Sequence, residues 1–328
     1  MSRSIVIEVV EASALDLEEV AGLQRACFGG VEGTSLLAAE LKRLQAVAGY
    51  RRRYWSPAGL ARIAMVRDSG RLVAMAAMVP TTIRHPGGTA TAWQNCDVAT
   101  LPEARGRGYH GQCLDALIGA LPPGDVFFGF PNANAVAGFA RNGGPLIADL
   151  SLHVMPMPRI LAAPDAKAVA RFDRRQDDLA LRLIGPKTTM IEKSARYLNW
   201  RYFDSIPGAY AAYMVERDGI AEGFVVIRAL RVGWVRLGVI MELFATTADT
   251  ELRLLAAARY WAFQQGCWAS LAGTSRWSKT FALRACAIPI PRRMAVRPLP
   301  LMGRTIDPNP ANAWLANWHS HLGDWDVL

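Results

Sequence analysis

Long apolar runs are what this sequence most plainly lacks. Of its 328 residues 52% are hydrophobic, and the mean hydropathy is +0.12. Even so, no uninterrupted apolar stretch reaches the ~18 residues that a transmembrane helix needs, and the longest, residues 72–83, has strand character. The first residues carry no long apolar core before the acid Glu8, so we expect no secretory signal and a cytoplasmic protein.

Cysteine and histidine are also scarce, with five of each. The scattered cysteines stand mostly in apolar patterns and are Cys27, Cys96, Cys113, Cys267 and Cys286. Such positions are typical of reduced core residues, and a catalytic Cys96 or Cys113 is the alternative. No Cys/His spacing suggests zinc, so we expect no metal site.

The charge balance is basic, with 37 Lys and Arg against 28 Asp and Glu, a net charge of +9. Part of the excess lies in clusters such as residues 51–53, 171–175 and 292–293. A positive excess attracts nucleic acid, an anionic membrane surface or an acidic cofactor. The sequence has no nucleic-acid recognition motif and no basic stripe interleaved with stacking aromatics, so we expect no nucleic-acid partner. A phosphate-bearing or membrane-associated substrate explains the charge more economically.

The most informative segment, residues 98–114, joins a strand to a helix. A β-like run ends at Pro102, a loop rich in Arg and Gly follows, and an amphipathic helix continues to about Leu121. Glycines let the backbone approach a ligand closely, and the first free N–H groups of a helix favour an anion. Arg105 and Arg107 add positive charge that can fork onto phosphate oxygens. The junction therefore predicts a phosphate site.

The spacing of this loop excludes the familiar nucleotide loops. A P-loop needs Gly-Lys-Ser/Thr, and no Lys is present here. Residues 106–111 match the bare Gly-x-Gly-x-x-Gly pattern of dinucleotide-binding folds, but residues 130–132, about twenty positions on, carry no carboxylate for a ribose.

The segment resembles motif A of the GCN5-related N-acetyltransferases (GNAT), in which Val-x-x-x-Pro-Glu-x-Arg-Gly-x-Gly links a strand to a helix. The resemblance implies acyl-CoA as donor, with the pantetheine arm at Val98 and Ala99. The residues implied to surround its pyrophosphate are Arg105, Gly106, Arg107, Gly108, Tyr109, His110 and Gly111. Asn132 and Asn134 are assigned to the cofactor site and are expected to cap a short helix. The family motif has Gly or Ala where this chain has His110.

The two halves of the chain repeat one order of elements at an offset of about 150 residues. Asp and Gly turn an apolar hairpin near residues 68–70 and again near residues 218–219. Residues 97–100 have a counterpart in residues 242–246, and each precedes a helix. The second loop, residues 247–251, has no Gly or Arg and two acids, so it should repel a pyrophosphate.

We therefore predict an α/β fold (α+β, mixed sheets) of two tandem GNAT-like acyltransferase units. Residues 1–158 form the acyl-CoA-binding unit, residues 159–190 a linking helix, and residues 191–328 a degenerate unit without the phosphate loop. In the first unit we expect helices near 17–28 and 35–48 and strands near 61–67, 72–79, 89–98 and 126–130.

The C-terminal tail, from residue 297, is predicted to wrap irregularly over the surface. Trp314, Trp318 and Trp325 are expected to pin it down. Three further segments, residues 129–132, 197–202 and 323–326, resemble a tandem bacterial subgroup of the same superfamily.

Acyl transfer to an amine needs proton transfer, and four residues are candidates for it. Asp97 ends the strand beside the expected thioester and is the first candidate base, with a strand-end hydrogen-bonding role as an equal alternative. Glu242, its counterpart in the repeat, is the second candidate and would bind the amine. His153 titrates near neutral pH but stands in an apolar run typical of a core residue. The acid is Tyr109 or a tyrosine of the second unit.

The resemblance implies acyl transfer from acyl-CoA, or from acyl carrier protein, to a primary amine by direct attack. High apolar content together with positive charge makes a lipidic, sphingoid-type amine a candidate acceptor, as in bacterial ceramide synthesis. It also makes peripheral contact with the inner membrane face an expectation. An amino sugar or another small amine is the alternative acceptor, and a non-catalytic acyl-CoA-sensing module is the alternative of another class.

Overall fold

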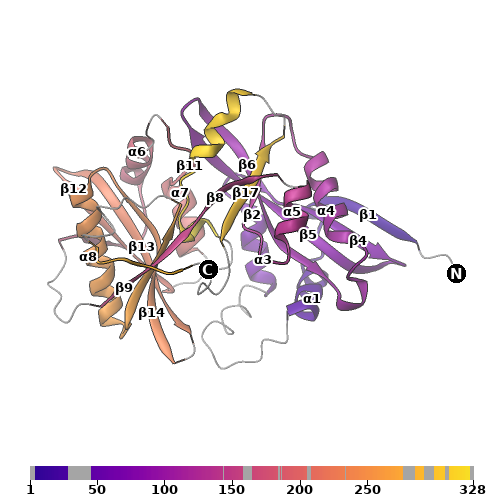
Figure 1. Cartoon of the computed structure of the whole chain (residues 1–328), viewed down its shortest axis with the longest axis horizontal. Helices are drawn as coiled ribbons and strands as arrows, with labels where there is room; N and C mark the ends of the chain where they lie inside the picture. Colours follow the sequence, from indigo (N-terminus) through magenta and orange to yellow (C-terminus); the bar gives the residue numbers. More distant parts are fainter. Residues whose placement is uncertain are drawn as a thin grey trace.

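Two α/β bodies lie side by side in the computed structural model, the first half in indigo to magenta and the second in orange (Figure 1). The structure describes residues 4–28, 46–142, 144–157, 165–183, 185, 187–204, 208–232, 234–275, 285–291, 299–306 and 310–325. Each body contains one mixed sheet, so the predicted tandem α/β fold is confirmed. The helix expected near residues 35–48 falls largely outside the described residues.

The first sheet has the strand order β1-β4-β5-β6-β7-β17-β8. Its strands are β1 (Ile5–Glu11), β4 (Arg62–Asp68), β5 (Arg71–His85), β6 (Gly88–Thr100), β7 (Val126–Gly129), β17 (Pro300–Thr305) and β8 (Leu146–Asp149). Neighbours are antiparallel except β6 and β7, which are parallel. The short β11 (Met190–Ile191) pairs with β5, and β2 (Trp55–Ser56) with β3 (Gly59–Leu60) forms a separate ladder.

Four described helices accompany the first sheet. They are α1 (Leu17–Phe28), α3 (Val47–Tyr54), α4 (Tyr109–Gly119) and α5 (Val136–Asn142). The bounds of α1 are those predicted. The Oδ1 atom of Asn132 accepts the N–H groups of Asn134 and Ala135 just before α5, so the predicted helix cap is confirmed.

The second sheet repeats the first, position by position, in the order β10-β12-β13-β14-β15-β9-β16. Its strands are β10 (Lys167–Val169), β12 (Tyr210–Arg217), β13 (Ile220–Val232), β14 (Val235–Ala245), β15 (Ala269–Thr274), β9 (Ser151–Pro156) and β16 (Ile288–Pro289). Only β14 and β15 are parallel. The helical elements are α6 (Arg174–Arg182), α7 (Ala195–Leu198), the π-helical turn η3 (Asn199–Phe203) and α8 (Ala248–Gln264). Within the predicted linker, α6 is shorter than expected because β10 precedes it.

Both predicted hairpins are confirmed, and both use the same turn. Ser69 and Gly70 have φ values of 54° and 86°, and Asp218 and Gly219 have values of 52° and 77°. Two consecutive left-handed residues define a type I′ turn, whose twist matches that of the flanking strands. Asp and Gly at these positions are therefore local causes of the β12–β13 connection.

The two units exchange one strand. β9, which lies within the residues predicted for the first unit, pairs with β15 in the second sheet. β17, about 150 residues later, pairs with β7 in the first sheet and holds the equivalent position. The prediction of an irregular tail was therefore wrong, because the edge of the parallel strand β7 binds part of that tail as a strand.

Three tryptophans anchor the chain after β17, as predicted. Trp314 stacks on His85 of β5 with ring centroids 4.1 Å apart. Trp318 is buried and packs against Phe128 of β7, and Trp325 is also buried. The C-terminal segment, yellow in Figure 1, thus runs between the two bodies and joins them.

Candidate functional site

Strand β6 separates from β7 at the start of the predicted cofactor motif. The parallel ladder covers residues 92–95 and 126–129, and beyond Asn95 the described part of β6 pairs with β5 alone. Asp97 and Val98 lie opposite a single residue of β5, and Asp97 has a φ of 48°. This is a β-bulge, which bends the strand and re-aims its groups. Beyond Asn95, the side of β6 that faces β7 therefore has no strand partner among the described residues, and its N–H and C=O groups are left for other partners.

The Arg/Gly loop follows directly and ends at the N-terminus of α4. Gly106 and Gly108 have φ values of 78° and 77°, in the left-handed region that favours glycine. Gly108 is the N-cap residue, and no side chain caps the helix there, so its first N–H groups point into the loop. Arg105 donates to the carbonyl of Thr100, and Arg107 pairs with Asp68 at 3.4 Å. The loop has the geometry of an anion site.

The next two residues of the motif turn away from the loop. Tyr109 is buried in the core of the first unit. His110 lies against α5, where a Cβ on Gly138 would come within 3.3 Å of its Nδ1 atom. Burial and the nearby Arg141 lower the pKa of His110, and its Nε2 atom has no partner among the described residues. A glycine in α5 thus makes room for histidine at this position.

Asp97 is held on the side of α3. Its carboxylate forms an ion pair with Arg53 at 3.0 Å, and the two side chains are 11% and 12% exposed. Gln24 of α1 donates to the Asp97 carbonyl at 2.8 Å. Strand alternation alone would place Asn95 and Asp97 on one face, but the bulge breaks it, and Asn95 donates to the carbonyl of Ala77. Asp97 itself lies at the bulge of β6 with a cationic partner.

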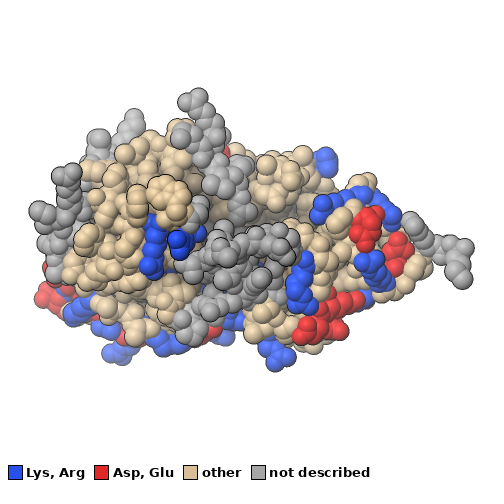
Figure 2. All heavy atoms as spheres, turned by 90° about the horizontal axis from the view of Figure 1, so that it is seen from below, with Lys and Arg blue, Asp and Glu red and all other residues tan. Residues whose placement is uncertain are grey.

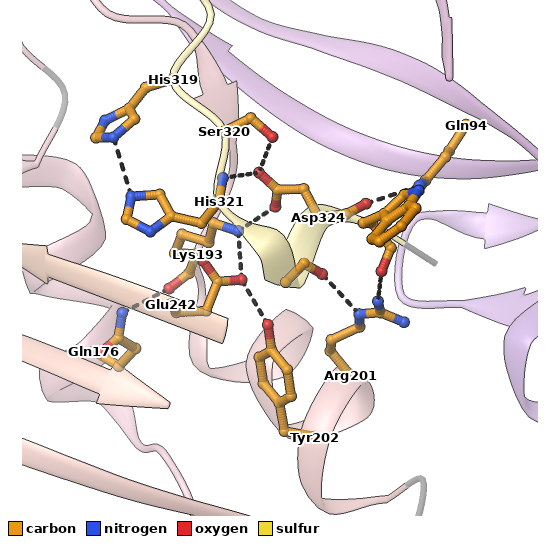
Figure 3. Close-up of polar contacts among 12 residues, drawn as sticks. Gln94, Gln176, Lys193, Arg201, Tyr202, Glu242, His319, Ser320, His321 and Asp324 are labelled. Atoms are coloured by element: carbon orange, nitrogen blue, oxygen red, sulfur yellow. Dashed lines mark hydrogen bonds and ion pairs between the residues drawn. The ribbon is translucent and has the colours of Figure 1, made fainter. Parts of the chain in front are cut away.

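The other predicted proton-transfer residues lie in the second unit. His153 is buried in β9, and burial lowers its pKa. Glu242 on β14 is fully buried and accepts hydrogen bonds from Lys193 and Tyr202, each at 2.7 Å (Figure 3). Lys193 also donates to Asp324 near the C-terminus. Neither His153 nor Glu242 stands at the splayed end of β6.

In the second unit, the C-terminal segment occupies the position beside β14 that corresponds to the unpaired side of β6. β14 pairs with β15 only as far as Ile240, and the turn η6 (Leu322–Asp324) packs against the following residues. A Cβ on Gly323 would overlap the Glu242 carboxylate. Phe244 contacts the ring of His321 at 4.4 Å. The second unit therefore lacks both the phosphate loop and the space for a pantetheine arm.

A cleft begins beside the bulge and runs between β5 and α7. Its inner pocket, a narrow space of about 20 Å³, is lined by Arg53, Val79, Pro80, Thr81, Gln94, Cys96, Tyr197, Trp200 and Arg201. Its outer pocket, about 140 Å³, is lined by Ser56, Pro57, Ala58, Pro80, Thr81, Thr82, Glu192, Ser194, Arg196 and Tyr197. The shared residues make the two pockets continuous, so the cleft uses both units.

Sequence reasoning missed this cleft, although two of its segments stood out. Residues 51–53 form a charge cluster in the sequence, and residues 197–202 resemble the tandem bacterial subgroup. Arg52 donates to the carbonyl of Trp200, and the indole N–H of Trp200 donates to the carbonyl of Arg52, each at 3.1 Å. That reciprocal contact across 148 residues has no local signal.

Residues 8–131 match the family model described as the acetyltransferase (GNAT) domain. The match covers 124 of the 328 residues and lies within the first unit. The fold resembles a probable N-acyltransferase from Enterococcus faecalis V583 (TM-score 0.64, 13% identity, covering 92% of this chain and 73% of that one). It also resembles a GCN5-related N-acetyltransferase from Anabaena variabilis (TM-score 0.62, 12% identity, covering 92% of this chain and 73% of that one). A third similar structure is Saccharomyces cerevisiae N-myristoyltransferase with bound myristoyl-CoA (TM-score 0.61, 11% identity, covering 93% of this chain and 80% of that one). No curated protein matches.

The match over residues 8–131 indicates an acyltransferase that takes acyl-CoA as its donor. Among the described residues, no group of three or more His, Cys, Asp or Glu side chains is placed to hold a metal ion. In the same part of the chain, no helix combines the length and apolar character needed to cross a membrane.

The buried Glu242 predicts how stability depends on pH. Burial raises its pKa to about 7, Asp324 adds to the rise, Lys193 opposes it, and the Oε2 atom has no partner among the described residues. Because the pKa in the unfolded chain is about 4.3, the folded state binds more protons between these values and loses stability as pH rises through them. We expect wild type to lose about 1–3 kcal/mol relative to Glu242→Gln between pH 5 and pH 8.

Urea unfolding of both proteins across this range measures the difference. Glu251→Gln is a positive control, because burial also raises the pKa of Glu251 to about 7, in α8 away from Lys193, and the same argument predicts a difference of the same sign. Burial holds the pKa of His321 well below its usual range, so this residue makes the folded protein less stable as pH falls. The effect is the same in wild type and in Glu242→Gln, so it cancels in the difference between them. Parallel curves for wild type and Glu242→Gln would show that Glu242 stays ionised.

Proposed function

We propose that the GNAT unit binds acyl-CoA along β6 and the Arg/Gly loop, and transfers the acyl group to a primary amine held in the cleft that faces the second unit. The observation that carries this proposal is the order of three features along one strand: the cleft at Cys96, the bulge at Asp97 and the anion loop from Arg105. This order matches the acyl acceptor, the thioester and the pyrophosphate of one reaction.

The donor's contacts follow from that order. Val98 and Ala99 would bind the pantetheine arm through the backbone groups that β7 leaves unpaired. The N–H groups of the loop and of the first turn of α4, from Gly106 to Gly111, would bind the pyrophosphate, with Arg105 and Arg107 supplying charge. Asn132 and Asn134 stand in the loop after β7, beyond the point where β6 and β7 separate.

The chemistry is a direct acyl transfer. The lone pair of the neutral amine attacks the thioester carbonyl carbon, a C–N bond forms, and the C–S bond breaks as the thiolate of CoA leaves. We assign proton removal from the amine to Asp97. This residue lies at the bulge of β6, next to Cys96 of the cleft and close to the point where β6 separates from β7. Tyr197 lines both pockets, whereas Tyr109 is in the core, so Tyr197 is our candidate to protonate the thiolate.

The acceptor is the part of the proposal that the fold leaves most open. The structural neighbour crystallised with myristoyl-CoA bears on the length of the donor's acyl chain, and in that protein only, so it lends no support to a lipidic, sphingoid-type amine as acceptor. An amino sugar or other small amine has the support of the outer pocket, whose lining includes Ser56, Thr82, Glu192, Ser194 and Arg196. We favour the polar amine, because these side chains offer hydrogen bonds that an alkyl chain cannot use.

Location and partners belong to the same proposal. We infer a cytoplasmic enzyme that takes acyl-CoA, with acyl carrier protein as the alternative donor. Peripheral membrane contact is supported by Trp234 and Trp268, which are 72% and 61% exposed with ring centroids 5.1 Å apart. Indole rings favour the membrane interface, and Arg231 and Arg236 lie on either side of Trp234 in the sequence. Sedimentation with anionic vesicles measures that contact.

The proposal is tested by separating binding from turnover. We expect acetyl-CoA or a long-chain acyl-CoA to raise the melting temperature, and release of CoA thiol when an accepted amine is added. Asp97→Asn should retain the thermal shift but lose about 10²–10⁴-fold in kcat, the usual contribution of a general base. Its matched control is Asp68→Asn, which removes the partner of Arg107 but is remote from proton removal.

Each result distinguishes a different alternative. A thermal shift without turnover for any amine would favour the non-catalytic acyl-CoA sensor. Unchanged turnover in Asp97→Asn would leave its ion pair with Arg53 as the structural role of this residue. No shift with acyl-CoA or with acyl carrier protein would contradict the function itself.

A further inference from the structure

The two pockets of the cleft differ widely in size. The outer pocket has a volume of about 140 Å³ and the inner one about 20 Å³. A space of roughly 10–15 Å³ holds one water molecule, which is about as large as an amino group, and a cavity of about 150 Å³ binds benzene. The inner space therefore accepts an amino group and little else, whereas the outer pocket has room for a compact ring.

The inner space lies at the reacting end of the cleft. Cys96 lines it and directly precedes the bulge at Asp97, the proposed base. Thr81 and Tyr197 line both pockets, so they mark the junction between them. An acceptor held in the outer pocket reaches the base through this space with its nitrogen alone. A second substituent on that nitrogen has no room, so the space selects a primary amine.

The Thr81 hydroxyl at the junction points to a ligand independently of the volumes. Thr81 is only 6% exposed, and its Oγ1 atom has no partner among the described residues. A buried hydroxyl without a hydrogen bond destabilises a folded protein. A threonine at this position is explained when the body of the acceptor supplies the missing partner.

Glu192 has an unused acceptor in the outer pocket. Arg84 donates twice to its Oε1 atom, at 3.0 Å and 2.6 Å, and no described residue donates to Oε2. The hydroxyl of Ser56 is different, because it already donates to the carbonyl of Pro80 at 2.6 Å. The Oε2 atom of Glu192 can therefore accept a hydrogen bond from a ligand hydroxyl.

The charges of the cleft disfavour an acceptor with a second amine. Arg84 offsets the charge of Glu192, and Arg53 forms an ion pair with Asp97 at 3.0 Å. Arg196, exposed in the outer pocket, would repel a second ammonium group. On the face shown in Figure 2, Lys and Arg side chains lie in several separate groups over both units. An uncharged, hydroxylated body suits the outer pocket better than a diamine.

We propose that the acceptor is a primary amine on a compact hydroxylated ring, whose amino group fills the narrow inner space while ring hydroxyls bond to Thr81 and to the Oε2 atom of Glu192. This inference rests on the proposed function and specifies its acceptor. Thr81 and Glu192 are then specificity-determining residues that do not touch the reacting atoms. A sphingoid-type amine is disfavoured, because its alkyl chain leaves both groups without a partner.

Matched amines test the two requirements. Glucosamine and galactosamine are compared with cyclohexylamine, which has a ring of the same size without hydroxyls, and with N-methylglucosamine, a secondary amine. The donor is the acyl-CoA that gives the larger thermal shift, and release of CoA thiol gives kcat/KM per concentration of neutral amine, because the probes differ in basicity. We expect the better amino sugar to exceed cyclohexylamine about 10–100-fold, the effect of two hydrogen bonds, and N-methylglucosamine at least about tenfold.

Variants locate the preference. Thr81→Val should lower kcat/KM for the better amino sugar about five- to tenfold through a higher KM, whereas Thr81→Ser keeps the hydroxyl and most of the preference. Glu192→Gln should lower it about three- to tenfold, since a hydrogen bond to a charged acceptor is lost. Both changes should alter kcat/KM for cyclohexylamine less than about twofold. Ser270→Ala is the matched control: its buried hydroxyl also lacks a partner among the described residues, but it lies in β15.

Failure of this inference is distinguishable from failure of the function. Cyclohexylamine reacting as fast as both amino sugars, or a preference that survives Thr81→Val and Glu192→Gln unchanged, overturns the hydroxylated acceptor while the acyl-CoA thermal shift stays intact. Equal rates for glucosamine and N-methylglucosamine overturn the selection by the inner space. A thermal shift without turnover of any amine overturns this inference in favour of the acyl-CoA sensor, and absence of any shift overturns the proposed function as well.

Discussion

Replacement of Lys193 by methionine is expected to lower the free energy of unfolding by about 3–5 kcal/mol, because the two buried side chains of Glu242 and Asp324 lose the cation that contacts both. Lys193, Glu242 and Asp324 all have fully buried side chains. Both carboxylates raise the pKa of Lys193 in spite of burial, so the lysine is the charged member of this cluster. The Ser320 hydroxyl and the backbone N–H of His321 also donate to Asp324, but both are uncharged and leave its charge unbalanced (Figure 3).

Chemical unfolding followed by far-ultraviolet circular dichroism measures the loss. Lys167→Met is the matched control, because Lys167 forms an ion pair with Glu216 but its side chain is 76% exposed, and such pairs contribute about 0–1 kcal/mol. If Lys193→Met does not fold, the double variant with Glu242→Gln is measured instead and should recover part of the loss. Equal stability of Lys193→Met and Lys167→Met would contradict the structural role.

Gly108→Val is expected to weaken acyl-CoA binding about ten- to hundredfold, the second large effect. Gly108 is the N-cap of α4 with a φ of 77°, and valine is strained there. The added side chain also keeps a phosphate from approaching the first N–H groups of the helix. Isothermal titration with acetyl-CoA measures the change.

Gly124→Val separates backbone strain from loss of the site. Gly124 has a φ of 85° and open space around its Cβ position, but it lies in the turn between α4 and β7. Both variants should lose similar stability, and only Gly108→Val should lose affinity. Wild-type affinity in Gly108→Val would place the pyrophosphate elsewhere.

Features caused by local chemistry were predictable from the sequence. Asp218 and Gly219 turn a hairpin because their own backbone preferences suit a type I′ turn. Gly106 and Gly108 adopt left-handed conformations before a helix, a preference of glycine itself, so the backbone of this loop is predictable from the local sequence. The sequence repeat makes Glu242 of β14 the equivalent of Asp97 of β6. The structure agrees with this, since each strand carries a bulge next to that residue.

Features that depend on distant partners were not predictable in the same way. Glu242 is buried because the C-terminal segment packs over it at Gly323, where a Cβ would overlap the carboxylate. Gly323 is about 80 residues away in the sequence. The segment β17 reads as a short run between prolines, and its pairing with β7 depends on Gly303, where a Cβ would overlap the Phe127 backbone. Likewise the cleft exists because Arg52 and Trp200 meet across the two units. Periodicity carries no information on such contacts.

The exchanged strands also constrain how the chain reaches its native state. When a ribosome has produced β7, the segment that will become its neighbour, β17, is still about 170 residues from being synthesised. The first sheet therefore waits with an open edge until nearly the whole polypeptide is available, and its closure is a long-range event of the kind that slows folding. The proposed acyl-CoA site lies on that same sheet, so we expect a nascent first half to lack activity.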